Sequence, residues 1–457
     1  MTRLPDTFVR ATLALLCAAG GAAGAQALPP IHALGPVEHK STELLGAVSA
    51  VRALPGGRVL VNDNSGRKVV LFEPSLATFS VVADTTSATA NAYSSRAGGL
   101  FAYKGDSSLF VDPTSLSMLV IDGVGKIARV MSVPRPNDAG SLIGGQSGTP
   151  GFDAQGRLVY RAAPNFGMPK RAAEGTFGMP VFPDSVLLVR IDLATRKLDT
   201  IGTVKTQKMN MSMTQDANGR MTVTSIQNPM QVVDDWAVLA DGSVAIVRGQ
   251  DYHIDWLAPD GTQWSSPKVP FAWLHMNDSM KVAFLDSTKT AFQKLRDAAM
   301  ARAAAGGGAN MPLIAPPGDG GGGGGAMIVM RMDAKAGAEM GARPSGPAGA
   351  PAAPVIPPMQ FVSPSELPDY APPFNAGSAR GDMDGNLWVR TTNTVGGGSV
   401  YDVISKKGEL MDRVQVPAGR VIAGFGVGGV VYMGVRDTDG VRLEQARRMV
   451  ASLGASR

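Results

Sequence analysis

Three polar residues alternate with apolar residues in one short segment of the sequence. Asp251, His253 and Asp255 are separated by single aromatic or aliphatic residues. On a β-strand this spacing places all three side chains on one face. Two carboxylates and an imidazole can bind a divalent cation, but a solvated strand face opposite a buried one explains the same alternation without a ligand. We favour the second interpretation and assign no metal ligand here.

An aromatic ring and a guanidinium near a later strand form a second set of candidates. Tyr370 precedes the segment Pro372-Pro373-Phe374, and Arg390 ends the strand motif that follows it. These side chains could contact a ligand, or the segment could only anchor the chain. The candidates for ligand contact are thus five residues, with no catalytic residue and no cofactor predicted: Asp251, His253, Asp255, Tyr370 and Arg390.

Several kinds of chemistry lack the residues that they need. Histidine occurs four times and cysteine once, as Cys17 near the N-terminus, so the remainder of the chain offers no disulfide or thiolate metal site. Asp234 and Asp235 are adjacent, and adjacent residues of a strand point to opposite faces. The formal net charge is +5, and the basic residues are scattered without a stripe, which argues against nucleic-acid binding.

The N-terminus has the pattern of an export signal. Arg3 and Arg10 precede an apolar run over residues 11–19, and small residues follow at 23–25. This order is typical of a secretory signal peptide, and the run is shorter than the roughly 20 residues of a membrane-spanning helix. We predict a signal peptide over residues 1–25, no transmembrane segment, and a periplasmic or secreted protein.

A turn followed by a strand recurs six times along the chain. Asp-Gly and Gly-Gly pairs supply the positive φ angles of tight hairpins, and the β-branched and aromatic residues after them favour strands. A second turn follows most copies about twenty residues later, which predicts two successive hairpins. The copies are Leu54–Val61, Lys104–Val111, Asp153–Tyr160, Ala240–Val247, Met383–Arg390 and Gly426–Met433.

Two hairpins make a four-stranded meander, which cannot bury both of its faces alone. A closed ring of meanders can. The sequence therefore predicts an all-β fold, one six-bladed β-propeller over residues 26–457, in which residues 34–40 add a strand to the short last blade. Residues 163–184 are an insertion in the third copy, and 218–223 are a candidate seventh turn.

Two segments depart from the strand pattern. Over 277–305 apolar residues recur with helical spacing, which predicts an amphipathic helix. Residues 306–360 are dominated by Gly, Ala and Pro, a composition that cannot offset the entropy of ordering. We predict a disordered loop there.

Four segments resemble exported bacterial six-bladed propellers of the NHL/TolB-like type: Trp236–Gly242, Tyr252–Gly261, Leu367–Phe374 and Gly385–Arg390. The resemblance covers most of the chain after the signal peptide. It implies six blades. The matching motifs mark blade structure, so the resemblance implies no functional residue.

Two functions are consistent with these features. The first is a monomeric, non-catalytic propeller that binds a peptide, glycan or protein partner, and this expectation makes the chain more a binding protein than an enzyme. The alternative is a metal-dependent hydrolase, lactonase or lyase with a divalent ion in the central channel. Converging Asp, Glu, Asn or His side chains in the channel would favour the alternative.

Overall fold

The protein is described by a computed structural model that covers residues 28–86, 91–94, 97–164, 183–208, 210–215, 221–304 and 359–449. The predicted signal peptide lies outside these residues. Within them no helix is long and apolar enough to cross a membrane. The chain forms a six-bladed β-propeller, as the repeats predict.

Each blade is an antiparallel sheet of four main strands, which are given in order from the channel outward. Blade 1 consists of β3 (Ala50–Ala53), β4 (Val59–Asp63), β5 (Lys68–Phe72) and β6 (Phe79–Asp84), and blade 2 of β7 (Gly99–Ala102), β8 (Ser108–Asp112), β9 (Ser117–Ile121) and β10 (Ile127–Ser132). Blade 3 consists of β11 (Gly151–Phe152), β12 (Leu158–Arg161), β13 (Ser185–Ile191) and β14 (Leu198–Lys205), and blade 4 of β17 (Asp235–Val238), β18 (Val244–Arg248), β19 (His253–Leu257) and β20 (Gln263–Ser265). Blade 5 consists of β22 (Phe374–Gly381), β23 (Leu387–Val395), β24 (Gly398–Ile404) and β25 (Leu410–Val416), and blade 6 of β26 (Arg420–Phe425), β27 (Val430–Arg436), β28 (Val441–Arg447) and β2 (Val37–Lys40).

The N-terminal part of the chain closes the ring. Strand β2 pairs with β28 in antiparallel fashion, so the fourth strand of blade 6 comes from the region predicted to supply it. Strand β1 (Ile31–Ala33) pairs in parallel with β25 and adds a fifth strand to blade 5, which the sequence did not indicate. Blades 5 and 6 are thus both tied to the N-terminal region.

Apolar side chains from neighbouring blades form the core. One cluster joins Leu60 of blade 1 to Phe110 of blade 2, and another joins Val59 to Tyr432 of blade 6. Every blade face is buried against the next blade, which is how a ring stabilises sheets that have two apolar faces. The strand side chains supply this core because they alternate between the two faces.

The strand order determines which connections lie at each end of the ring. In an antiparallel meander, the first and third strands begin at one end of the blade. The long connections 162–184, 206–234 and 266–373 leave and rejoin the blades at that end, hereafter the insertion end. The turns of the six repeats lie at the opposite end, hereafter the turn end, including η1 (Pro55–Gly57).

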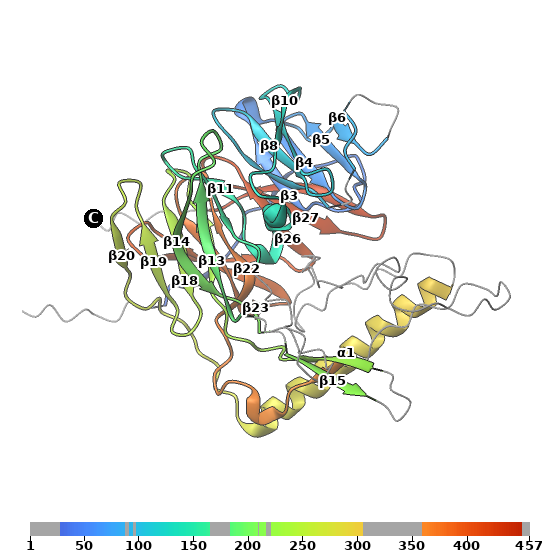
Figure 1. The fold of residues 1–457 in the computed structure, drawn as a ribbon, viewed down its shortest axis with the longest axis vertical. Coiled ribbons are helices and arrows are strands. Elements are labelled where there is room, and N and C mark those ends of the chain that lie inside the picture. Colours follow the sequence, from blue (N-terminus) through green and yellow to red (C-terminus); the bar gives the residue numbers. More distant parts are fainter. Residues whose placement is uncertain are drawn as a thin grey trace, which may run out of the picture.

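A small unit extends from the insertion end. Helix α1 (Asp278–Ala304) matches the helix predicted over 277–305, and its buried Leu285 packs in one cluster with Val362 and Leu367 near η4 (Pro364–Glu366). Its Phe292 ring contacts the Phe361 ring. Strands β15 (Asn210–Gln215), β16 (Met221–Gln227) and β21 (Met359–Phe361) form a separate sheet beside it. In Figure 1, α1 and β15 lie together to one side of the blades.

The outcome of two sequence predictions follows from this unit. Residues 221–223 of the candidate seventh turn belong to β16, which pairs with β15 and β21 and adds no blade, and residues 218–220 lie outside the described part of the chain. Most of the predicted loop over 306–360 lies outside the described residues. Its last two residues were predicted wrongly, because Met359 and Gln360 pair with β16 as part of β21.

A segment between blades 2 and 3 crosses the insertion end of the channel. It consists of the 3-10 turns η2 (Pro136–Ile143) and η3 (Gly145–Ser147), and we call it the crossing segment. η2, the short blue-green coil near the centre of Figure 1, contacts β7, β8 and β12, whereas η3 contacts β22 of blade 5. The side chain of Tyr160 fixes it by donating a hydrogen bond to Asp138 over 2.8 Å.

Candidate functional site

The three alternating polar residues lie on one face of blade 4. Asp251, His253 and Asp255 are half-buried, and the residues between them are buried, as the alternation predicts. The two ring nitrogens of His253 lie 2.6 Å from Asp251 Oδ1 and 3.3 Å from Asp255 Oδ1. The imidazole therefore bridges Asp251, in the turn before β19, and Asp255 on β19, which is the third strand from the channel.

The carboxylates of this trio have other protein partners. Arg248 donates to Asp255 Oδ2 over 2.7 Å and to Asp234 Oδ2 over 2.7 Å. Its guanidinium and the Ser265 hydroxyl hold the pKa of Asp255 below its usual value, although burial opposes them. Across the part of the chain that the structure describes, no group of three or more His, Cys, Asp or Glu side chains is placed to hold a metal ion.

We predict that the His253→Ala variant unfolds with a free energy within about 1 kcal/mol of the unchanged protein, because half-exposed ion pairs contribute little. Urea denaturation at pH 7.5 measures this difference. The imidazole is only one of several partners of its two carboxylates. A loss of several kcal/mol would contradict a surface role for this trio.

Tyr370 lies where the inserted segment returns to the ring. It forms an isolated β-bridge with His275, and its ring centroid lies 5.1 Å from that of His275 and 6.4 Å from that of Trp273. The residue is 51% exposed. Its contacts are thus with the outgoing arm of the same insertion, which is the arrangement expected of an anchor.

Arg390 is the predicted candidate that lies nearest to the inner strand of blade 5. It lies on β23 directly opposite Tyr401, and two residues beyond Trp388, which lies opposite Arg380 of the inner strand β22. Residues opposite each other in an antiparallel pair share a face, and diagonal neighbours lie within about 7–8 Å. Arg380 and Arg390 therefore share one face of blade 5.

A buried carboxyl group lies at the neighbouring inner strand. Asp235 begins β17 and is 2% exposed. Its Oδ1 accepts a hydrogen bond from the Trp236 backbone over 2.9 Å, and its Oδ2 accepts one from the Ala379 backbone of blade 5 over 2.7 Å. Burial raises the pKa of Asp235 to about 6, although these backbone donors and Arg161 oppose the rise.

A third guanidinium joins this carboxyl from blade 3. Arg161 ends β12, and its Nη2 donates to Ser147 Oγ of the crossing segment over 2.9 Å. Its Nε is buried without a hydrogen-bond partner among the described residues. Burial lowers the pKa of Arg161, and the charge of Asp235 raises it. Arg161 thus links the crossing segment to Asp235.

A bulge in β22 lies beside Asp235 and the crossing segment. Phe374 pairs with Thr391 and Ala379 pairs with Val389, so the residues between them on β22 bulge out of the ladder. Such bulges re-aim strands next to functional sites. Gly377 in the bulge has a φ of 78°, and a Cβ there would lie 2.7 Å from the Gly145 carbonyl oxygen of the crossing segment.

These elements define one candidate site, hereafter the channel site: Arg161, Asp235, Ser378, Arg380 and Arg390. Of the five residues predicted from the sequence, Arg390 belongs to it. Asp234 and Asp235 do diverge as predicted, since Asp234 binds Arg248 and Asp235 binds blade 5. Arg161 and Arg380 were missed.

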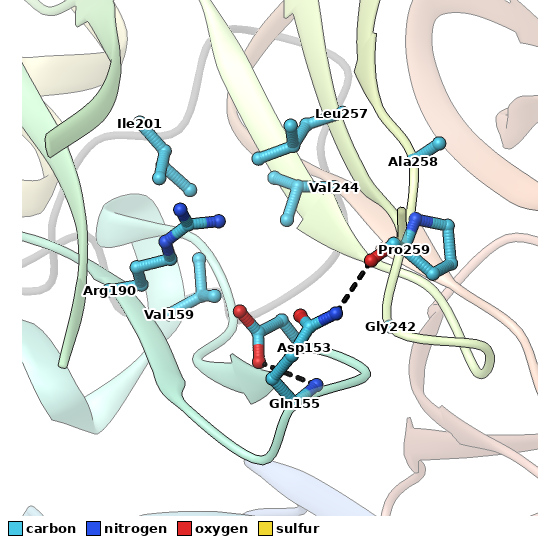
Figure 2. A pocket seen from close by; sticks show the side chains of 10 residues that line it. All are labelled: Asp153, Gln155, Val159, Arg190, Ile201, Gly242, Val244, Leu257, Ala258 and Pro259. Atoms are coloured by element: carbon cyan, nitrogen blue, oxygen red, sulfur yellow. Dashed lines mark hydrogen bonds between the residues drawn. The ribbon is translucent and has the colours of Figure 1, made fainter. Parts of the chain in front are cut away.

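A crevice between blades 3 and 4 lies away from this site, at the turn end. Figure 2 shows Gln155 reaching across it, and its Nε2 donates to the Pro259 carbonyl over 2.7 Å. Apolar side chains such as Val159 and Leu257 form much of its wall, together with the half-buried Arg190. Because Gln155 ties the two blades together there, the crevice belongs to blade packing.

Comparison with known proteins identifies no family for this chain. No protein-family model matches it, and no curated protein matches it. Solved structures do share its fold. A structural-genomics protein named as a candidate gluconolactonase is 11% identical, with 91% of this chain and 96% of that one covered and a TM-score of 0.35.

Two further neighbours have the same degree of likeness. Virginiamycin B lyase from Staphylococcus aureus is 9% identical, over 90% of this chain and 87% of its own, with a TM-score of 0.31. A PQQ-bound aldose sugar dehydrogenase from Streptomyces coelicolor is 12% identical, over 92% and 99%, with a TM-score of 0.36. At these identities the likeness shows the propeller fold alone.

These neighbours correct one expectation from the sequence. The chain was expected to be more a binding protein than an enzyme, but the propellers that share its fold are mainly named as enzymes. The names of these neighbours run against the expectation of a non-catalytic protein. The NHL/TolB-like type and the export of the chain stay predictions.

Proposed function

We propose that this protein is a propeller enzyme of the hydrolase, lactonase or lyase type, acting at the channel site. One observation carries the proposal: a buried carboxyl, Asp235, lies among guanidinium groups where three blades and the crossing segment meet. The predicted signal peptide supports the further proposal that the enzyme acts in the periplasm or outside the cell.

The residue types fit this chemistry. Ester or lactone hydrolysis and eliminations next to a carbonyl develop negative charge on oxygen, which fixed cationic donors stabilise. In this proposal Arg380 holds the developing oxyanion. Asp235, whose pKa of about 6 is close to neutral pH, exchanges the proton, since proton transfer is most efficient when the pKa lies near the working pH.

The sequence suggested, as an alternative, an enzyme with a divalent ion in the central channel. That ion is not part of the proposal. A hard divalent cation needs several oxygen ligands, and the channel site as defined has one carboxyl group against three guanidiniums. The residues of the site do not fit such an ion. No step is therefore assigned to a metal.

Replacement of Arg380 tests the proposal. We expect the unchanged protein to turn over at least one member of a panel of lactones, carboxylate esters and β-elimination substrates. Arg380→Gln should lower kcat/KM by about 100-fold, the usual effect of losing one oxyanion donor. Arg190→Gln is the matched control, because it removes a half-buried arginine from the crevice between blades 3 and 4. Equal activity of Arg380→Gln and the unchanged protein would refute the assignment.

A further inference from the structure

The channel site has more positive charge than its own residues neutralise. Arg161 and Arg380 both lie within reach of the charge of a single carboxyl, Asp235. Both oxygens of that carboxyl already accept backbone hydrogen bonds. Like charges that are close together on a half-buried surface repel each other, so this arrangement favours an added negative charge.

The donors of Arg380 are available to such a charge. Its guanidinium is half-buried, and among the described residues it makes no hydrogen bond or ion pair. A guanidinium has five N–H donors in a planar fork that matches two oxygens of a carboxylate or phosphate. Burial lowers the pKa of Arg380 most, the nearby Tyr401 raises it, and the Arg390 charge lowers it further.

Two more unused polar groups lie beside Arg380 and Asp235. The Ser378 hydroxyl is buried without a partner among the described residues, and the residue is 2% exposed. The Nε of Arg161 is likewise buried without a partner. Buried polar groups are normally satisfied, and an oxyanion that accepts hydrogen bonds would satisfy both.

We propose that the channel site binds an oxyanion group, a carboxylate or a phosphate, with Arg380 as its principal ligand and Arg161 and Ser378 as further donors. This inference rests on the proposed function and names its substrate class: the substrate carries a negatively charged oxygen group. The crossing segment covers this place, so Arg380 and the bound oxyanion would be partly shielded from water. Such shielding strengthens charge-assisted hydrogen bonds.

Calorimetric titration of the purified protein tests this inference without any turnover. Malonate and inorganic phosphate serve as probes at constant ionic strength, with chloride as the background anion. We expect saturable binding of at least one probe, and the preferred probe distinguishes a carboxylate from a phosphate. Arg380→Gln should weaken binding at least tenfold, and Arg190→Gln should leave it unchanged.

The inference would be overturned if Arg380→Gln bound the probes as tightly as the unchanged protein does. It would also be overturned if the unchanged protein bound neither malonate nor phosphate. The melting temperature of each variant in chloride confirms that the variant is folded, and Arg380→Lys, which keeps the charge, should retain part of the affinity. Anion binding without turnover of any panel substrate would sink the catalytic proposal and keep the anion site. Turnover of neutral substrates without anion binding would sink the anion site and keep the catalytic proposal.

Discussion

The Asp235→Ala variant should lose about 2–5 kcal/mol of unfolding free energy at pH 4.5, because two buried backbone N–H groups lose their acceptor. These groups belong to Trp236 and to Ala379 of the adjacent blade. The carboxyl therefore joins blades 4 and 5 at the channel. Urea denaturation of the variant and the unchanged protein measures the loss.

The loss should shrink as the pH rises. The pKa of Asp235 is about 6 in the folded protein, against a usual value of 3.8. The folded state thus holds this proton more tightly than the unfolded state, and the stability that the group contributes is full below pH 3.8 and falls as the pH rises to about 6. The gap between the two proteins should narrow by about 2 kcal/mol between pH 4.5 and pH 7.5, because part of the contribution is already lost at pH 4.5.

Asp297→Ala is the control for this experiment, since Asp297 is exposed on α1 and bonds only to Gln293 among the described residues. It should change the unfolding free energy by less than about 0.5 kcal/mol. A destabilisation of Asp235→Ala that stays constant between pH 4.5 and 7.5 would show that the carboxyl does not titrate as described.

The Gly377→Ala variant should lose about 2–4 kcal/mol. An L side chain at its φ of 78° costs roughly 1–2 kcal/mol, and the added Cβ, 2.7 Å from the Gly145 carbonyl oxygen, forces the backbone of the crossing segment to move. Such overpacking costs about 1–3 kcal/mol. Thermal unfolding followed by circular dichroism measures the sum.

Gly261→Ala separates the two contributions to this loss. Gly261 has a φ of 90°, and a Cβ there would have nothing within 4 Å. It therefore carries only the conformational cost. If both alanine variants melt at the same temperature, the contact between the β22 bulge and the crossing segment contributes nothing to stability.

Local signals made most of this fold predictable. Tight-turn residues followed by β-branched residues marked the second strand of every blade, and helical spacing marked α1 to within a residue at each end. The pairing of β2 with β28 could be predicted because the last repeat was too short. The parallel pairing of β1 with β25 could not, because two segments so distant in the chain carry no shared turn.

The channel site was harder to predict because its members come from different repeats. Alternation placed His253 and Asp255 on one face of β19, whereas Asp251 lies in the turn before that strand. The pattern gave no information about the distance of the strand from the channel. Arg161 and Arg390 both directly follow the apolar strand residues of their repeats, but Asn62, Asp112 and Arg248 do the same in other copies, so this position does not single the two arginines out. Arg380 has no signal either, because the bulge that precedes it leaves no mark in the sequence.

The pairing of β2 with β28 also sets the order of events during synthesis. A ribosome makes β2 first and β28 last among the described strands of blade 6. The earliest strand must therefore wait, unpaired, until translation is nearly complete, and the open ring exposes two unprotected blade faces for that whole period. A premature stop codon a few residues before β28 would leave the ring permanently open. We expect such a product to aggregate rather than to retain part of its function.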